Sequence, residues 1–195
     1  ALVRGAVDLL QYGLRTGGIA LDLQLDERLP ELRADGDQLG QVVLNLLVNA
    51  QQALVAAPAP RRLLLQTGHD AGPDTARLWL QVSDNGPGVD AALRERIFEP
   101  FFTTKREGVG TGLGLSVSRS VARQHGGELG LHAGPCVLGG ATFRLSLPLA
   151  PPAAAEAPAP TGTDDEPPTS RLLVVDDEPE LAALMRDMLE AAGFE

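Results

Sequence analysis

The feature that most constrains this chain of 195 residues is a series of four short motifs between residues 45 and 143. In chain order they are Asn45-Leu-Leu-Val-Asn49-Ala50, Asp84-Asn85-Gly86-Pro87-Gly88, Gly108-Val-Gly110-Thr-Gly112-Leu-Gly114-Leu115 and Gly139-Gly140-Ala-Thr142-Phe143. A single glycine pattern would be a weak signal. Four motifs in this order predict a fold that brings amide side chains, a carboxylate and bare glycine backbone to one site.

The spacing of apolar residues predicts the elements that carry these motifs. Helices are expected over residues 2–14, 37–54 and 113–125, with Asp37 as the N-cap of the second and a further short helix over 90–96. Strands are expected over residues 19–25, 62–67, 78–83, 128–133 and 142–147. The sequence therefore predicts an α/β two-layer sandwich, with helices on one face of a mixed, mostly antiparallel five-stranded sheet.

Charge and composition divide the chain near residue 150. Residues 1–150 carry 15 acidic and 14 basic side chains, whereas residues 151–195 carry 11 acidic and 2 basic ones. Residues 150–170 are rich in Pro, Ala and acids, and we expect a disordered linker there. The first part lacks the basic stripe of a nucleic-acid binder, so no nucleic-acid partner is expected. Cys136 is the single cysteine, which excludes an internal disulfide and fits a cytoplasmic location.

Asn45 and Asn49 lie four residues apart on one predicted helix, so they share a face that is otherwise apolar. Neutral amides on such a face need partners. Magnesium carried by a triphosphate takes one or two protein oxygens, and Asn49 is the candidate ligand, with Asn45 in support. An Asn pair bonded only to backbone is the alternative.

Asp84 ends a predicted strand and precedes Gly86 and Gly88. A carboxylate at a strand end can accept the exocyclic N–H of adenine, and glycine lets the backbone pass close beneath the base. The same five residues are also rich in turn formers, so an ordinary turn is an equally good interpretation of this motif alone.

The third motif leads into a predicted helix, where free backbone N–H groups bind phosphate. The candidate nucleotide contacts in this loop are Gly108, Gly110, Thr111, Gly112, Leu113 and Gly114. Lys105, the only lysine of the chain, adds a positive charge beside them. The alternatives are a solvated lysine and a flexible linker.

These motifs resemble the ATP-binding catalytic domain of bacterial sensor histidine kinases, in the superfamily shared with gyrase and MutL. The similarity covers about residues 20–148, and Phe98-Glu-Pro-Phe-Phe-Thr-Thr-Lys105 favours the kinases within it. Gln51-Gln52-Ala53 is similar to kinases of the nitrogen-regulation type. The resemblance implies a Bergerat-type fold over 18–149, with 1–17 as the end of a dimerisation-helix region.

Carried over to this sequence, the resemblance implies ATP and Mg²⁺ as cofactors and a set of site residues. Asn49 would bind magnesium, Asp84 the adenine, Lys105 a phosphate, and Thr142 would help to hold the base. Many relatives have Lys or Arg where Gln52 stands, which leaves more of the phosphate contact to Lys105. The candidate catalytic residues are Asn45 and Lys105.

The resemblance also implies the partners. The activity would be transfer of the γ-phosphoryl group of ATP to a His on a dimerisation helix. No histidine precedes His69 in this sequence, so that helix would lie upstream. The parent protein would be a homodimer, with a membrane anchor upstream as an open possibility. Residues 171–195 resemble the start of a response-regulator receiver domain, in which Asp176 and Asp177 would form part of a magnesium site. The parent would then be a hybrid kinase, acting on this receiver domain or on a separate response regulator.

Two other functions remain open at this point. One is an ATPase or serine kinase of the same superfamily, of the anti-sigma type. The other is a protein-interaction module that has kept the fold without nucleotide binding.

Overall fold

The computed structural model describes residues 2–70, 76–105, 110–132, 134 and 136–149. The chain divides into two units, Ala1–Ala155 and Glu156–Glu195, and the described residues all belong to the first. The predicted linker over 150–170 and the predicted receiver start over 171–195, with Asp176 and Asp177, lie outside the described residues.

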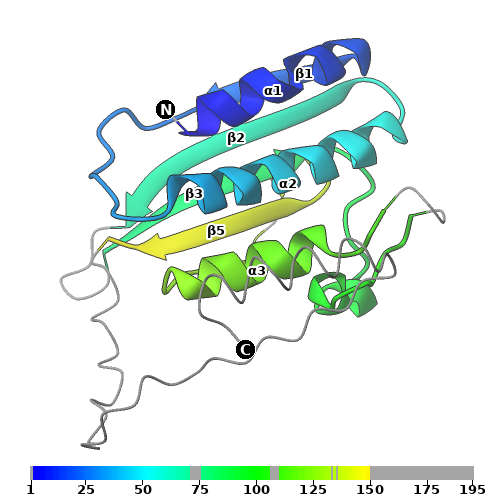
Figure 1. Ribbon diagram of the computed structural model, residues 1–195. Coiled ribbons are helices and arrows are strands. Elements are labelled where there is room, and N and C mark those ends of the chain that lie inside the picture. Colours follow the sequence, from blue (N-terminus) through cyan, green and yellow to red (C-terminus); the bar gives the residue numbers. More distant parts are fainter. Residues whose placement is uncertain (1, 71–75, 106–109, 133, 135, 150–195) are drawn as a thin grey trace, which may run out of the picture. The chain divides into compact units, whose positions relative to one another are not determined.

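A five-stranded sheet forms one layer of the first unit (Figure 1). Its strands are β1 (Ile19–Gln24), β2 (Arg61–Asp70), β3 (Arg77–Asp84), β4 (Glu128–Leu131) and β5 (Thr142–Pro148). They lie in the order β1-β2-β3-β5-β4, with β1 parallel to β2 and the other three pairs antiparallel. The predicted mixed, mostly antiparallel sheet is confirmed.

Three helices cover one face of this sheet, as Figure 1 shows. They are α1 (Leu2–Thr16), α2 (Gly36–Val55) and α3 (Gly114–Gln124). The apolar stripe of α2 is buried, with Leu46, Leu47 and Leu54 fully inaccessible to solvent. α1 packs against α2 and contributes Ala6, Val7 and Leu14 to the same core. The assignment of residues 1–17 to the end of a dimerisation-helix region stays a prediction.

Two local predictions were wrong. The N-cap of α2 is Asp35, not Asp37, because the Asp35 carboxylate accepts hydrogen bonds from the backbone N–H groups of Asp37 and Gln38, both at 3.0 Å. Both aspartates suit a cap, and the path of the chain from β1 decides between them. In place of the predicted short helix over 90–96 there are two 3₁₀ turns, Ala91–Leu93 and Arg96–Phe98.

The pairing of β3 with β5 positions two of the motifs. Ser83 lies opposite Thr142 in the ladder, and their hydroxyl oxygens are 2.9 Å apart. This register brings the end of β3, with Asp84, against the start of β5. Among the described residues, no helix has the length and apolar character needed to span a membrane.

Candidate functional site

The polar side chains of α2 open into a pocket of about 280 Å³ between this helix, the segment after β3 and the start of α3. Its lining includes the predicted residues Asn45, Asn49, Lys105, Gly110, Thr111, Gly112 and Gly114. Gln52, Ile97, Phe102, Thr103 and Thr104 also line it. Residues far apart in the sequence, predicted separately from their chemistry, therefore share one cavity.

Asn45 joins α2 to α3 at the base of this pocket. Its side-chain amide donates to the hydroxyl of Ser118 at 3.2 Å and to the carbonyl of Gly114 at 3.4 Å. Its oxygen accepts from the side chain of Gln41 at 3.1 Å. Asn45 thus links α2 to the first turns of α3.

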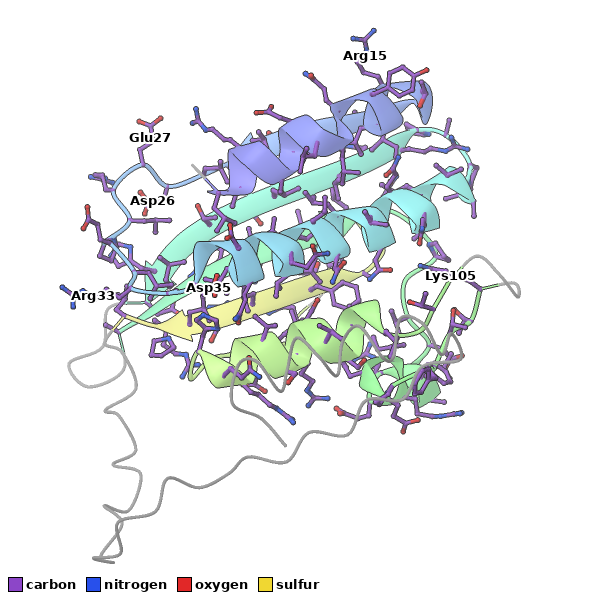
Figure 2. The ribbon with its side chains drawn as sticks, viewed as in Figure 1. Arg15, Asp26, Glu27, Arg33, Asp35 and Lys105 are labelled. Carbon is purple, nitrogen blue, oxygen red and sulfur yellow. The ribbon has the colours of Figure 1, made fainter. Side chains whose placement is uncertain are left out.

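Lys105 reaches across the pocket to two further amide side chains of α2, those of Asn49 and Gln52. Its ammonium group donates to Asn49 Oδ1 at 3.0 Å and also to Gln52 Oε1. Burial lowers the pKa of the Lys105 ammonium below its usual value of 10.5, since the charged form loses hydration. Figure 2 shows Lys105 near the C-terminal end of α2 and Asp35 at the opposite end of that helix.

The N-terminus of α3 forms another wall of the pocket. The helix begins at Gly114, after an N-cap residue, Leu113, whose side chain makes no capping hydrogen bond. Gly112 has a φ of +68°, and a Cβ there would overlap the backbone of Phe101, so only glycine fits this position. The uncapped helix start, lined by glycine, suits an anionic phosphate. Gly108 lies outside the described residues.

Asp84, at the end of β3, belongs to a second group of site residues. It is buried, with 3% of its surface exposed, and its Oδ1 accepts hydrogen bonds from the N–H of Gly86 at 2.8 Å and of Ala141 at 3.3 Å. Burial raises the pKa of the Asp84 carboxyl above its usual value of 3.8, and these two backbone hydrogen bonds partly oppose the rise. A buried carboxylate with its second oxygen uncommitted in the described structure can accept a ligand's N–H.

Gly86, whose N–H donates to the Asp84 carboxylate, lies against the C-terminal end of α2. A Cβ on Gly86 would lie 3.0 Å from Asp84 Oδ1 and 3.5 Å from the Cβ of Ala53, the neighbour of Gln52. The lining of the 280 Å³ pocket includes Asn49 but not Asp84, Gly86, Gly88 or Thr142.

Sequence reasoning missed two residues of the site. Gly140 belongs to the last glycine motif, in which the sequence predicts only Thr142 as a contact. In the structure the Gly140 N–H donates to the carbonyl oxygen of Asp84 at 3.1 Å. Gln52 lacks the positive charge of many relatives at this position, but no local pattern indicates that Lys105 lies against it.

The residues present fit a magnesium ion bound as its nucleotide complex. The amide oxygens of Asn49 and Gln52 already converge on a cation, the ammonium of Lys105. Amide oxygen is a donor that magnesium accepts, and the ion needs only one or two such ligands when phosphates supply others. Among the described residues there is no cluster of three His, Cys, Asp or Glu side chains that could hold a metal alone.

Comparison with known proteins identifies the family of this chain. Residues 34–151 match the family described as "Histidine kinase-, DNA gyrase B-, and HSP90-like ATPase". The chain is 46% identical over 158 residues to the two-component sensor PprA of Pseudomonas aeruginosa. That match covers 80% of this chain but only 16% of PprA.

Solved structures of histidine kinases are similar to this chain as well. The nucleotide-free catalytic domain of histidine kinase ThkA has a TM-score of 0.64 at 29% identity, covering 77% of this chain and 93% of that one. Full-length ShkA in complex with AMPPNP has a TM-score of 0.62 at 28% identity, covering all of this chain and 38% of that one. The chain therefore belongs to the histidine kinase-, DNA gyrase B-, and HSP90-like ATPase family, and it contains the catalytic domain of a bacterial sensor histidine kinase.

Proposed function

We propose that this domain binds ATP with magnesium and presents the γ-phosphoryl group to a His on a dimerisation helix of the same protein. The observation that carries the proposal is the pocket in which Asn49, Lys105 and the N-terminus of α3 face one cavity. It combines an amide oxygen for a metal, a positive charge and free backbone N–H groups.

Each group has a task in this proposal. Asp84 accepts the exocyclic N–H of adenine, with Gly86, Gly88 and Thr142 around the base. Lys105, Gly110, Gly112 and Gly114 contact the phosphates, and Asn45 keeps α3 in register with α2. When bound, magnesium would neutralise part of the phosphate charge through an oxygen of Asn49.

The reaction needs no nucleophile from this domain. An imidazole nitrogen of the acceptor His attacks the γ-phosphorus, the bond from phosphorus to the β–γ bridging oxygen breaks, and ADP leaves. The residues of this chain hold the triphosphate in line and stabilise its charge. Lys105 is the group best placed to do so, because its ammonium is already inside the pocket.

The wider assignments rest on the relatives. The structure of ThkA in complex with the response regulator protein TrrA supports a response regulator as a partner. The resemblance of residues 171–195 to the start of a receiver domain supports a hybrid kinase, and full-length ShkA matches over the whole of this chain. We also propose a homodimeric parent of the nitrogen-regulation type and a cytoplasmic location for this domain.

Calorimetric titration with ATP and magnesium tests the binding step. We expect Asn49→Ala to weaken binding by at least about tenfold, the size of one lost hydrogen bond or ligand to a charged group. Gln51→Ala is the matched control, because Gln51 is on the same helix but its side-chain amide lies against Gly13 of α1. Equal affinity of wild type and Asn49→Ala would refute the assignment.

A second experiment tests the transfer step. The chain is mixed with ATP labelled at the γ-phosphate and with the dimerisation helix of the same parent protein. Acid-labile, base-stable label on the His of that helix supports the proposal. Release of free phosphate, or label on serine, would instead support an ATPase or a serine kinase of the same superfamily.

A further inference from the structure

Position 52 contacts Lys105, the only lysine of the chain. The Lys105 ammonium lies between two amide oxygens of α2, at 3.0 Å from Asn49 Oδ1 and in contact with Gln52 Oε1. The backbone N–H of Lys105 also donates to Thr103 Oγ1 at 3.1 Å, so both ends of this residue are held. Lys105 is thereby directed into the pocket.

The two amide oxygens are not equivalent once a nucleotide arrives. Under the proposed function, Asn49 Oδ1 would bind magnesium, and its hydrogen bond to Lys105 would weaken or be lost. Gln52 Oε1 has no competing partner among the described residues, so it remains available to the ammonium. A lysine or arginine at position 52 would instead place a second positive charge against Lys105.

We propose that Gln52 is a positioning residue for Lys105, whose ammonium it holds in the pocket at the place where the phosphates of ATP bind. This inference rests on the proposed function of the pocket and adds a role for a residue that need not touch the nucleotide. The segment after β3 thus supplies the phosphate-binding cation, the ammonium of Lys105. Helix α2 supplies the acceptor that orients it, the side-chain oxygen of Gln52.

Neighbouring groups support this arrangement. A Cβ on Gly110 would lie 3.0 Å from Thr103 Oγ1 and 3.1 Å from Lys105 Cδ, so the glycine leaves room for the lysine stem. No carboxylate forms an ion pair with Lys105 in the described part of the chain. Neutral amides hold the ammonium without cancelling its charge, which keeps that charge available to a phosphate.

The single lysine makes a direct test possible. Chain produced with lysine labelled with ¹³C at Cε gives one side-chain NMR signal, that of Lys105. In the free protein we expect this signal to differ from that of free lysine, and to move towards the free-lysine position in Gln52→Met. Gln51→Met is the control and leaves the signal in place, since Gln51 lies against α1.

A double-mutant cycle tests the role in binding. We expect Gln52→Met to weaken calorimetric binding of ATP with magnesium about 3- to 10-fold, as for one hydrogen bond. In the Lys105→Met background the same substitution changes the affinity by less than about twofold, because the group through which Gln52 acts has been removed.

The outcomes separate the two proposals. An unmoved lysine signal in Gln52→Met, or equal effects of that substitution with and without Lys105, overturns the positioning role. Absence of ATP binding in the wild type overturns the proposed function instead, while the NMR comparison in the free protein still reports whether Gln52 holds Lys105.

Discussion

The backbone of Gly140 lies directly against the carboxyl group of Asp84. Its N–H donates to the Asp84 carbonyl oxygen at 3.1 Å, and a Cβ at position 140 would lie 2.5 Å from Asp84 Oδ1. Two motifs from distant parts of the sequence are therefore parts of one structure, in which the start of β5 supports the end of β3.

This contact predicts a strong effect of Gly140→Ala. The added methyl group must displace the Asp84 carboxylate, so we expect ATP affinity to fall at least about tenfold and the free energy of unfolding to fall by about 1–3 kcal/mol. Calorimetry and urea unfolding measure the two effects. Gly130→Ala is the control, because no atom lies within 4 Å of a Cβ there. Wild-type affinity in Gly140→Ala would contradict the prediction.

Burial of Asp84 predicts how stability depends on pH. Its pKa is raised above 3.8 in the folded protein, so the unfolded chain loses this proton first as the pH rises. The free energy of unfolding contributed by Asp84 is highest below pH 3.8 and falls as the pH rises to the raised pKa. Urea unfolding at a series of pH values, compared with Asp84→Asn, measures this fall. The difference between wild type and variant should change with pH in this window. Parallel stability curves would show that the pKa of Asp84 is not raised.

Substitutions at Gly112 and Gly18 distinguish the effect of backbone strain from the effect of steric overlap. Gly112→Ala places a Cβ within 2.7 Å of Phe101 Cα, in a backbone conformation with φ of +68°. We expect ATP affinity to fall at least about tenfold, because the turn before α3 must move. Gly18→Ala has a similar φ of +62° with no atom within 4 Å, so it tests strain alone. It should lower stability by about 1 kcal/mol and leave ATP binding unchanged. Similar ATP affinities of the two variants would show that the overlap with Phe101 does not matter for the site.

Arg61 predicts a stability effect away from the pocket. Its guanidinium donates to the carbonyl oxygens of Ala57 at 2.9 Å, Gly17 at 2.7 Å and Val55 at 2.9 Å, joining the end of α2 to the turn before β1. We expect Arg61→Met to lower the free energy of unfolding by about 2–4 kcal/mol, since three carbonyl groups lose a charged donor. The neighbouring Arg62 is exposed, and Arg62→Met should change stability by less than about 0.5 kcal/mol in the same urea titration. Equal stabilities of the two variants would contradict this role.

Much of the fold could be predicted because its signals are local. The apolar spacing in residues 37–54 gave the buried face of α2, and alternation in 19–25 gave β1. These patterns depend on helix and strand periods, which a few residues suffice to reveal. The choice between Asp35 and Asp37 as N-cap, and the 3₁₀ turns near Ala91, depend on the path of the chain and were predicted wrongly.

The sequence by itself determined which groups are available: amides four residues apart on a helix, an acid at the end of a strand, glycines before a helix and a single lysine. Only the tertiary structure decided how they meet. It placed Lys105 between Asn49 and Gln52 and Gly140 against Asp84, and it left Asp84 out of the lining of the pocket. The physical reason is that such contacts join segments far apart in the chain, and their geometry follows from how the helices pack on the sheet and how β3 pairs with β5.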